Sequence, residues 1–135
     1  MKTNLDRVFK TDSKAEKDGV WFQVPDTEVK FLLKRLGGSN DAKVKSAMAM
    51  YYKPKARLIE LEQLSEEEVR SIMAKVLCEA CLLDWEGIID EETGLEIPFD
   101  LEKAHTLIKG LPELFDKLWK YASSADSYRV DVGNS

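Results

Sequence analysis

The sequence has few of the residues that most often carry catalysis or bind metals and phosphates. Its 135 residues include a single histidine, two cysteines and seven glycines. No apolar run approaches the roughly 20 residues of a membrane-spanning helix, and residues 1–19 have no apolar segment of the kind found in signal peptides. We therefore expect a cytoplasmic protein with no membrane association, in which both cysteines are reduced.

The two cysteines, Cys78 and Cys81, form one CxxC motif. A structural zinc site takes four ligands, and the sequence has neither a second CxxC nor a pair of histidines. A thioredoxin-like site needs the motif at the start of a helix, whereas here it falls near the end of a predicted helix. We favour buried structural cysteines, with redox chemistry at this pair as the alternative.

The other candidate chemical sites also lack part of their pattern. An EF-hand loop has Asp or Asn at its fifth position and glycine at its sixth. Counted from Asp84 these positions hold two isoleucines, and counted from Asp90 they hold a glycine and a leucine. His105 has no partners at a spacing that supports a catalytic triad, and Gly37-Gly38 lacks the Lys-Ser or Lys-Thr of a phosphate loop. We predict no catalytic residues, no metal site and no cofactor.

Charge is distributed unevenly along the chain. Residues 1–57 contain 13 Lys and Arg and 7 Asp and Glu, a net charge of +6, whereas residues 58–135 contain 7 and 18, a net charge of −11. This asymmetry can steer head-to-tail contacts between copies, although two solvated faces would give the same pattern. Basic and aromatic residues of the first half could also bind nucleic acid, but the overall charge of −5 argues against it.

The patterning predicts a small, mostly helical α+β domain over residues 19–122. Hydrophobic residues make up 44% of the chain, which is sufficient for one core. We expect a flexible arm or a short strand at 1–18 and a flexible tail at 123–135, because both segments are polar and charged.

A β-hairpin is predicted at the start of this domain. Residues 19–24 are aromatic and β-branched, the next three indicate a turn, and residues 28–36 alternate between apolar and polar side chains. Residues 28–36 could instead form a helix, but the preceding turn favours the strand.

The clearest helix signal begins at Ser65, which forms a capping box with Glu68. Apolar side chains then recur at helical spacing, which predicts a helix from about residue 66 to 84. Residues 87–98 predict a short second hairpin. Further helices are predicted from residue 40 or 41 to a kink or end at Pro54, over 101–109, and from Pro112 to 122; residues 54–64 form a helix or an irregular connection.

Three tryptophans lie in different predicted elements and most simply belong to the core or its rim. A partly exposed tryptophan would be a natural anchor for a partner helix, and Trp85 is the first choice because it lies where the central helix meets the second hairpin. The candidate partner-binding residues are Trp85, Phe99, Trp21, Trp119, Lys43 and Arg35.

Several short motifs occur together in one order. They are Gly-Val-Trp at 19–21, Trp-Glu-Gly-Ile-Ile-Asp at 85–90, Gly94, Ile-Pro-Phe-Asp at 97–100 and Leu-Pro-Glu-Leu at 111–114. In this order and spacing, over residues 17–122, the chain resembles the tail assembly chaperones of long-tailed, lambda-like bacteriophages.

The resemblance implies a non-enzymatic protein of the host cell cytoplasm that is not part of the mature virion. Such chaperones coat and solubilise the tape-measure protein, help to recruit tail tube subunits, and self-associate. A longer form, made by programmed frameshifting, binds the tube protein, so this chain would be the short form. The alternative is a small nucleic-acid-associated or regulatory phage protein that uses the basic N-terminal half.

Overall fold

The aromatic and β-branched residues near position 20 form the first strand of an antiparallel sheet. The computed structural model describes residues 1–130, and in it β1 (Val20–Gln23) pairs with β2 (Lys30–Leu33). The intervening turn contains Asp26 with a φ of 64°. The predicted N-terminal hairpin is confirmed, and the fold is α+β as the sequence predicts.

A third strand, β3 (Leu82–Glu86), pairs antiparallel with β2 and gives a sheet in the order β1-β2-β3. The sequence predicts a helix as far as residue 84, and this boundary is wrong. α5 (Glu66–Ala80) ends earlier, because pairing with β2 satisfies backbone groups on both strands. Periodicity could not mark this boundary, since Leu83 and its neighbours are apolar and fit either structure.

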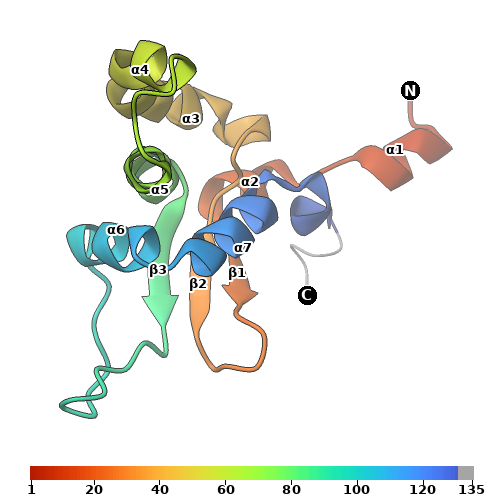
Figure 1. Cartoon of the computed structure of the whole chain (residues 1–135). Coiled ribbons are helices and arrows are strands. Elements are labelled where there is room, and N and C mark those ends of the chain that lie inside the picture. Colours follow the sequence, from red (N-terminus) through yellow and green to blue (C-terminus); the bar gives the residue numbers. More distant parts are fainter. Residues whose placement is uncertain (131–135) are drawn as a thin grey trace.

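The helices from residue 41 onward follow the predicted order (Figure 1). The bounds of the other helices are α1 (Asn4–Phe9), α2 (Ser13–Asp18), α3 (Asp41–Ala47), α4 (Ala56–Glu60), α6 (Leu101–Lys109) and α7 (Pro112–Ser123). Between α3 and α4 the chain stays helical through a π-helical stretch at Met48–Tyr52 and a 3₁₀ turn at Lys53–Lys55. Pro54 lies in that turn, where the regular α-helical pattern is interrupted as expected for proline.

The loop between β3 and α6 is less regular than the second hairpin that the sequence predicts. Its only β pairing is one isolated bridge, between Ile89 and Glu96. The turn is present, since the Asp90 N–H donates to the Leu95 carbonyl at 2.9 Å. A hairpin with so little pairing is not stable by itself, so contacts with the domain determine the position of this loop.

The first 18 residues form two short helices, where the sequence predicts an arm or a strand. α2 packs into the domain: Ala15 and Glu16 are buried, and the Glu16 carboxylate accepts a hydrogen bond from Arg35. Thr3 and Asp12 are the N-caps of the two helices, a signal that is present in the sequence but masked by the high charge. The predicted arm is therefore wrong for residues 13–18.

The chain beyond α7 also packs against the domain. A 3₁₀ turn at Ala125–Tyr128 places the Tyr128 ring in the core, where it is 0% exposed. The Tyr128 hydroxyl donates to the Leu33 carbonyl at 3.0 Å. The predicted flexible tail is wrong for this segment, because burial of one large ring stabilises an otherwise polar stretch. Residues 131–135 of the predicted tail lie outside the described residues.

The core lies between the sheet and helices α5, α6 and α7 (Figure 1). Its large, fully buried side chains include Phe31, Leu33, Val76, Leu77, Ile108, Leu118 and Tyr128. α3 and α4 form a lobe above α5, and α1 projects from the body on the other side. This arrangement leaves grooves where α4 and α6 meet their neighbours.

Candidate partner-binding grooves

Trp85 is buried, at 5% exposure, in agreement with the core or rim position expected of the three tryptophans; it is therefore not the partly exposed anchor offered as the alternative. Its Nε1 donates to the Ile97 carbonyl at 2.8 Å. The ring packs edge-on against Phe31 and Phe99, with ring centroids 6.3 and 5.2 Å away. Pairing of β3 with β2 places Trp85 on the inner face of the sheet, which sequence periodicity did not predict.

The other candidate residues are spread over the molecule. Trp21 is 40% exposed on the edge strand β1, and Trp119 is half-buried on α7 with its ring 5.6 Å from that of Phe115. Lys43 is exposed on α3, whereas Arg35 is paired with Glu16. Of the six candidates, only Trp85 and Phe99 are brought into contact.

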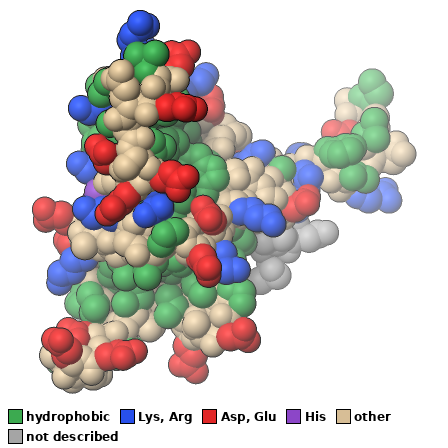
Figure 2. All heavy atoms as spheres, in the orientation of Figure 1, with side chains coloured by type: hydrophobic (Ala, Val, Ile, Leu, Met, Phe, Trp, Pro, Cys, Tyr) green, Lys and Arg blue, Asp and Glu red, His purple; other side chains and the backbone are tan. Residues whose placement is uncertain are grey.

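A groove lies beside this aromatic pair, between β3, the following loop and α6. We call it the β3–α6 groove; it has a volume of about 470 Å³ and is lined by Trp85, Ile88, Ile97, Asp100, Glu102, Lys103, Thr106 and Leu107. Its floor is apolar and its rim is charged. Figure 2 shows hydrophobic side chains gathered below α6, above the acidic tip of the loop.

Local interactions hold the two walls of the β3–α6 groove. Asp100 is the N-cap of α6 and accepts a hydrogen bond from the Lys103 N–H at 2.9 Å. At the other wall, Gly87 has a φ of 85°, and a Cβ there would lie 2.6 Å from the Glu28 carbonyl oxygen. The Gly87 N–H donates to Glu96 at 2.8 Å. Only glycine therefore allows the loop to leave β3 in this direction.

A second groove lies on the other side of α5. We call it the α4–α5–α7 groove; it has a volume of about 670 Å³ and is lined by Ile59, Glu62, Leu64, Glu66, Val69, Arg70, Met73, Pro112, Phe115 and Asp116. The Arg70 Nε donates to the Lys109 carbonyl at 3.1 Å. The other charged lining side chains, Glu62, Glu66 and Asp116, are exposed and acidic. An apolar floor with an acidic rim suits a basic amphipathic segment.

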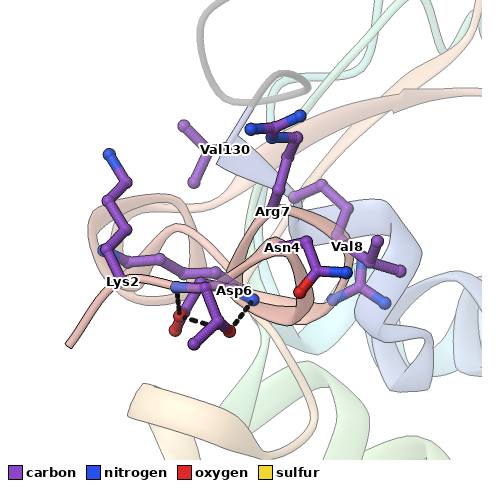
Figure 3. A pocket seen from close by; sticks show the side chains of 9 residues that line it. Lys2, Asn4, Asp6, Arg7, Val8 and Val130 are labelled. Carbon is purple, nitrogen blue, oxygen red and sulfur yellow. Dashed lines mark hydrogen bonds between the residues drawn. The ribbon is translucent and has the colours of Figure 1, made fainter.

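A third hollow, of about 650 Å³, lies between α1 and the residues that follow Tyr128 (Figure 3). Charged and polar side chains, including Lys2, Asp6 and Arg7, line it. Arg129 crosses to α1, where its Nη1 donates to the Phe9 carbonyl at 2.6 Å. Residues from both ends of the described chain therefore line this hollow.

The surroundings of the two cysteines and of the histidine indicate structural roles. Cys78 and Cys81 are free and buried, and burial raises the pKa of each thiol to about 12. At neutral pH very little thiolate is present, which disfavours redox or nucleophilic chemistry. His105 connects α6 to α5, with its Nε2 2.9 Å from the Ser71 carbonyl oxygen.

Within residues 1–130, no group of three or more His, Cys, Asp or Glu side chains is placed to hold a metal ion. No helix in the same range is both long and apolar enough to cross a bilayer.

Sequence reasoning did not identify most residues of the two apolar grooves. Ile88, Ile97 and Leu107 are half-buried. Each lies in a different segment of the chain, so the sequence pattern around one of them does not show that the three line the same groove. The available signal was Trp85, which the sequence places where the central helix meets the second hairpin and which lines the β3–α6 groove; it did not indicate the exposed side chains around it.

Residues 39–132 match the family model described as YdaY prophage protein. This match extends from the 3₁₀ turn at Gly38–Asn40, just before α3, to beyond Tyr128, and it includes both apolar grooves. No curated protein and no solved structure matches the chain.

Proposed function

The chain belongs to the YdaY prophage protein family and is therefore phage-derived, and we propose that it is a tail assembly chaperone for the tape-measure protein. The observation that carries this proposal is the β3–α6 groove, whose apolar floor and charged rim suit one face of an amphipathic helix. Half of its lining residues, Trp85, Ile88, Ile97 and Asp100, also belong to the motifs through which the sequence resembles such chaperones.

The size of the groove supports weak binding at each site. A volume of about 470 Å³ accommodates a few apolar side chains, so one copy covers a short piece of a long helical client. Many copies along one client then bind through effective concentration, since each bound neighbour keeps the client close. A chaperone that must leave during assembly benefits from such individually weak contacts.

In this proposal the protein is not an enzyme and uses no cofactor. It acts in the host cell cytoplasm during tail assembly, keeps the tape-measure protein soluble, helps to bring tail tube subunits to it, and is absent from the mature virion. A longer frameshifted form would contribute the main contact with the tube protein.

Co-expression with the tape-measure protein of the same phage tests the proposal. We expect the wild-type chain to increase the soluble fraction of that protein. Thr106→Trp should abolish the increase, because Thr106 is exposed on α6 and an indole there fills the groove without changing the core. Lys117→Trp is the matched control, since Lys117 is exposed on α7 and lines none of the three hollows. If the wild-type chain leaves the solubility unchanged, the chaperone function is wrong.

A nucleic-acid-associated role is the second candidate, and one observation favours it. Lys43, Lys53, Lys55 and Arg57 are all exposed on the lobe of α3 and α4, where Figure 2 shows blue side chains among acidic ones. Binding to duplex DNA that weakens steeply as salt rises would support this role. The absence of such binding at low salt would exclude it.

A further inference from the structure

α1 is an amphipathic helix, and none of the described residues covers its apolar face. Leu5, Val8 and Phe9 lie at i, i+3 and i+4, on one face, and are 60%, 57% and 65% exposed. No residue of α1 is buried. Figures 1 and 2 show the helix standing away from the body.

A six-residue helix of this kind is not stable in water by itself, because the unfavourable free energy of helix nucleation exceeds the stabilisation from a few hydrogen bonds. Local and tertiary contacts nevertheless define it. Thr3 and Asp6 form a capping box, and Arg129 binds the Phe9 carbonyl. The Asp12 N–H donates to the Tyr128 carbonyl at 2.7 Å. The body therefore holds α1 at a set position and displays its apolar face.

The α4–α5–α7 groove has the complementary chemistry. Its floor is formed by apolar side chains such as Val69 and Phe115, and its exposed rim is acidic. Residues 2–10, which comprise α1 and its immediate neighbours, carry three basic side chains, Lys2, Arg7 and Lys10, and one acidic side chain, Asp6. An apolar face with a basic border thus matches an apolar floor with an acidic border.

We propose that α1 of one copy of this chain docks into the α4–α5–α7 groove of a second copy. A copy cannot fill its own groove, because α1 projects on the side of the body opposite α4 and α5 (Figure 1). The contact joins two different surfaces and is therefore heterologous, so it produces a ring or an open string of copies. It leaves the β3–α6 groove free and does not depend on the proposed chaperone function.

The test measures association of purified chains by sedimentation velocity over a range of concentrations. The wild-type chain should form oligomers as concentration rises. Leu5→Ser/Phe9→Ser should raise the dissociation constant about tenfold or more, since it removes the apolar anchors. Glu62→Lys/Asp116→Lys should do the same from the groove side, and both residues are exposed, so the fold is kept.

Mixing the two variants identifies the heterologous contact. One variant retains an intact groove and the other an intact α1, so the mixture should form a one-to-one complex and nothing larger. Met50→Ser is the matched control, because Met50 is 64% exposed but lies outside both surfaces. A wild-type chain that stays monomeric, or variants that associate like the wild type, would overturn the proposal. Failure of the mixture to form a complex would also overturn it.

Discussion

At the scale of single residues, an ion pair between the buried Glu16 and the partly buried Arg35 connects α2 to the segment that follows β2. The Glu16 carboxylate accepts hydrogen bonds from Arg35 and from the Ser39 hydroxyl and N–H. Gly38 makes room for this cluster, since a Cβ there would lie 2.0 Å from the Glu16 Oε2. Burial raises the pKa of Glu16, but the hydrogen bonds from Arg35 and Ser39 outweigh that effect and lower it.

Glu16→Gln should therefore destabilise the protein by about 2 kcal/mol at neutral pH, because it leaves Arg35 without its anionic partner. The folded pKa of Glu16 is below the usual 4.5, so its contribution is present above that value and is lost as pH falls through the folded pKa. Urea denaturation should show the difference from wild type shrinking below about pH 4.5.

The control for this prediction is Asp41→Asn. Asp41 pairs with Lys45 at 3.0 Å, but the Lys45 side chain is exposed and that of Asp41 is about half exposed, so loss of this pair should lower the free energy of unfolding by less than about 0.5 kcal/mol. If the two substitutions lowered the free energy of unfolding equally, burial of Glu16 would not be the reason that its ion pair stabilises the fold.

At the scale of elements, α4 ends in a Schellman motif with an unsuitable residue. The Glu62 N–H donates to the Ile59 carbonyl at 3.0 Å, and the Gln63 N–H donates to the Leu58 carbonyl at 2.9 Å. Glu62 has a φ of 56°, in the left-handed region that favours glycine at this position.

Glu62→Gly should stabilise the protein by about 0.5–1 kcal/mol, because it relieves the left-handed strain at this helix end. Thermal and urea denaturation measure the change. Glu60→Gly is the control, since Glu60 is the last residue of α4 and glycine there should destabilise by up to about 1 kcal/mol. Loss of stability in Glu62→Gly would show that the motif is not strained.

At the scale of the whole molecule, Tyr128 joins the end of the described chain to the sheet and to α2. Its ring packs 6.1 Å from that of Tyr121, and its backbone carbonyl accepts from the Asp12 N–H. Burial raises the pKa of the Tyr128 phenol, so the hydroxyl stays a neutral donor to Leu33.

Tyr128→Ala should cost about 3–5 kcal/mol through the cavity it creates, and Tyr128→Phe about 1–2 kcal/mol through the lost hydrogen bond to a buried carbonyl. Urea denaturation measures both changes. Tyr52→Phe is the control, because Tyr52 is half-buried and its hydroxyl has no hydrogen-bond partner among the described side chains. A chain that tolerates Tyr128→Ala would show that residues 125–128 are not part of the folded unit.

Local signals in the sequence determined the elements that depend on neighbours in the chain. The capping box at Ser65, Pro112 at the start of α7 and the turn between β1 and β2 were predicted correctly, because their energies arise from residues a few positions apart. The order of the helices and the α+β class follow from the same signals.

Only the tertiary structure decided β3, the burial of Tyr128, and the two apolar grooves. Each of these depends on partners far away in the chain: β3 needs the edge of β2, and Tyr128 needs the Leu33 carbonyl. A strand or an aromatic ring gains its stability from the surface it meets, and that surface exists only once the chain has folded.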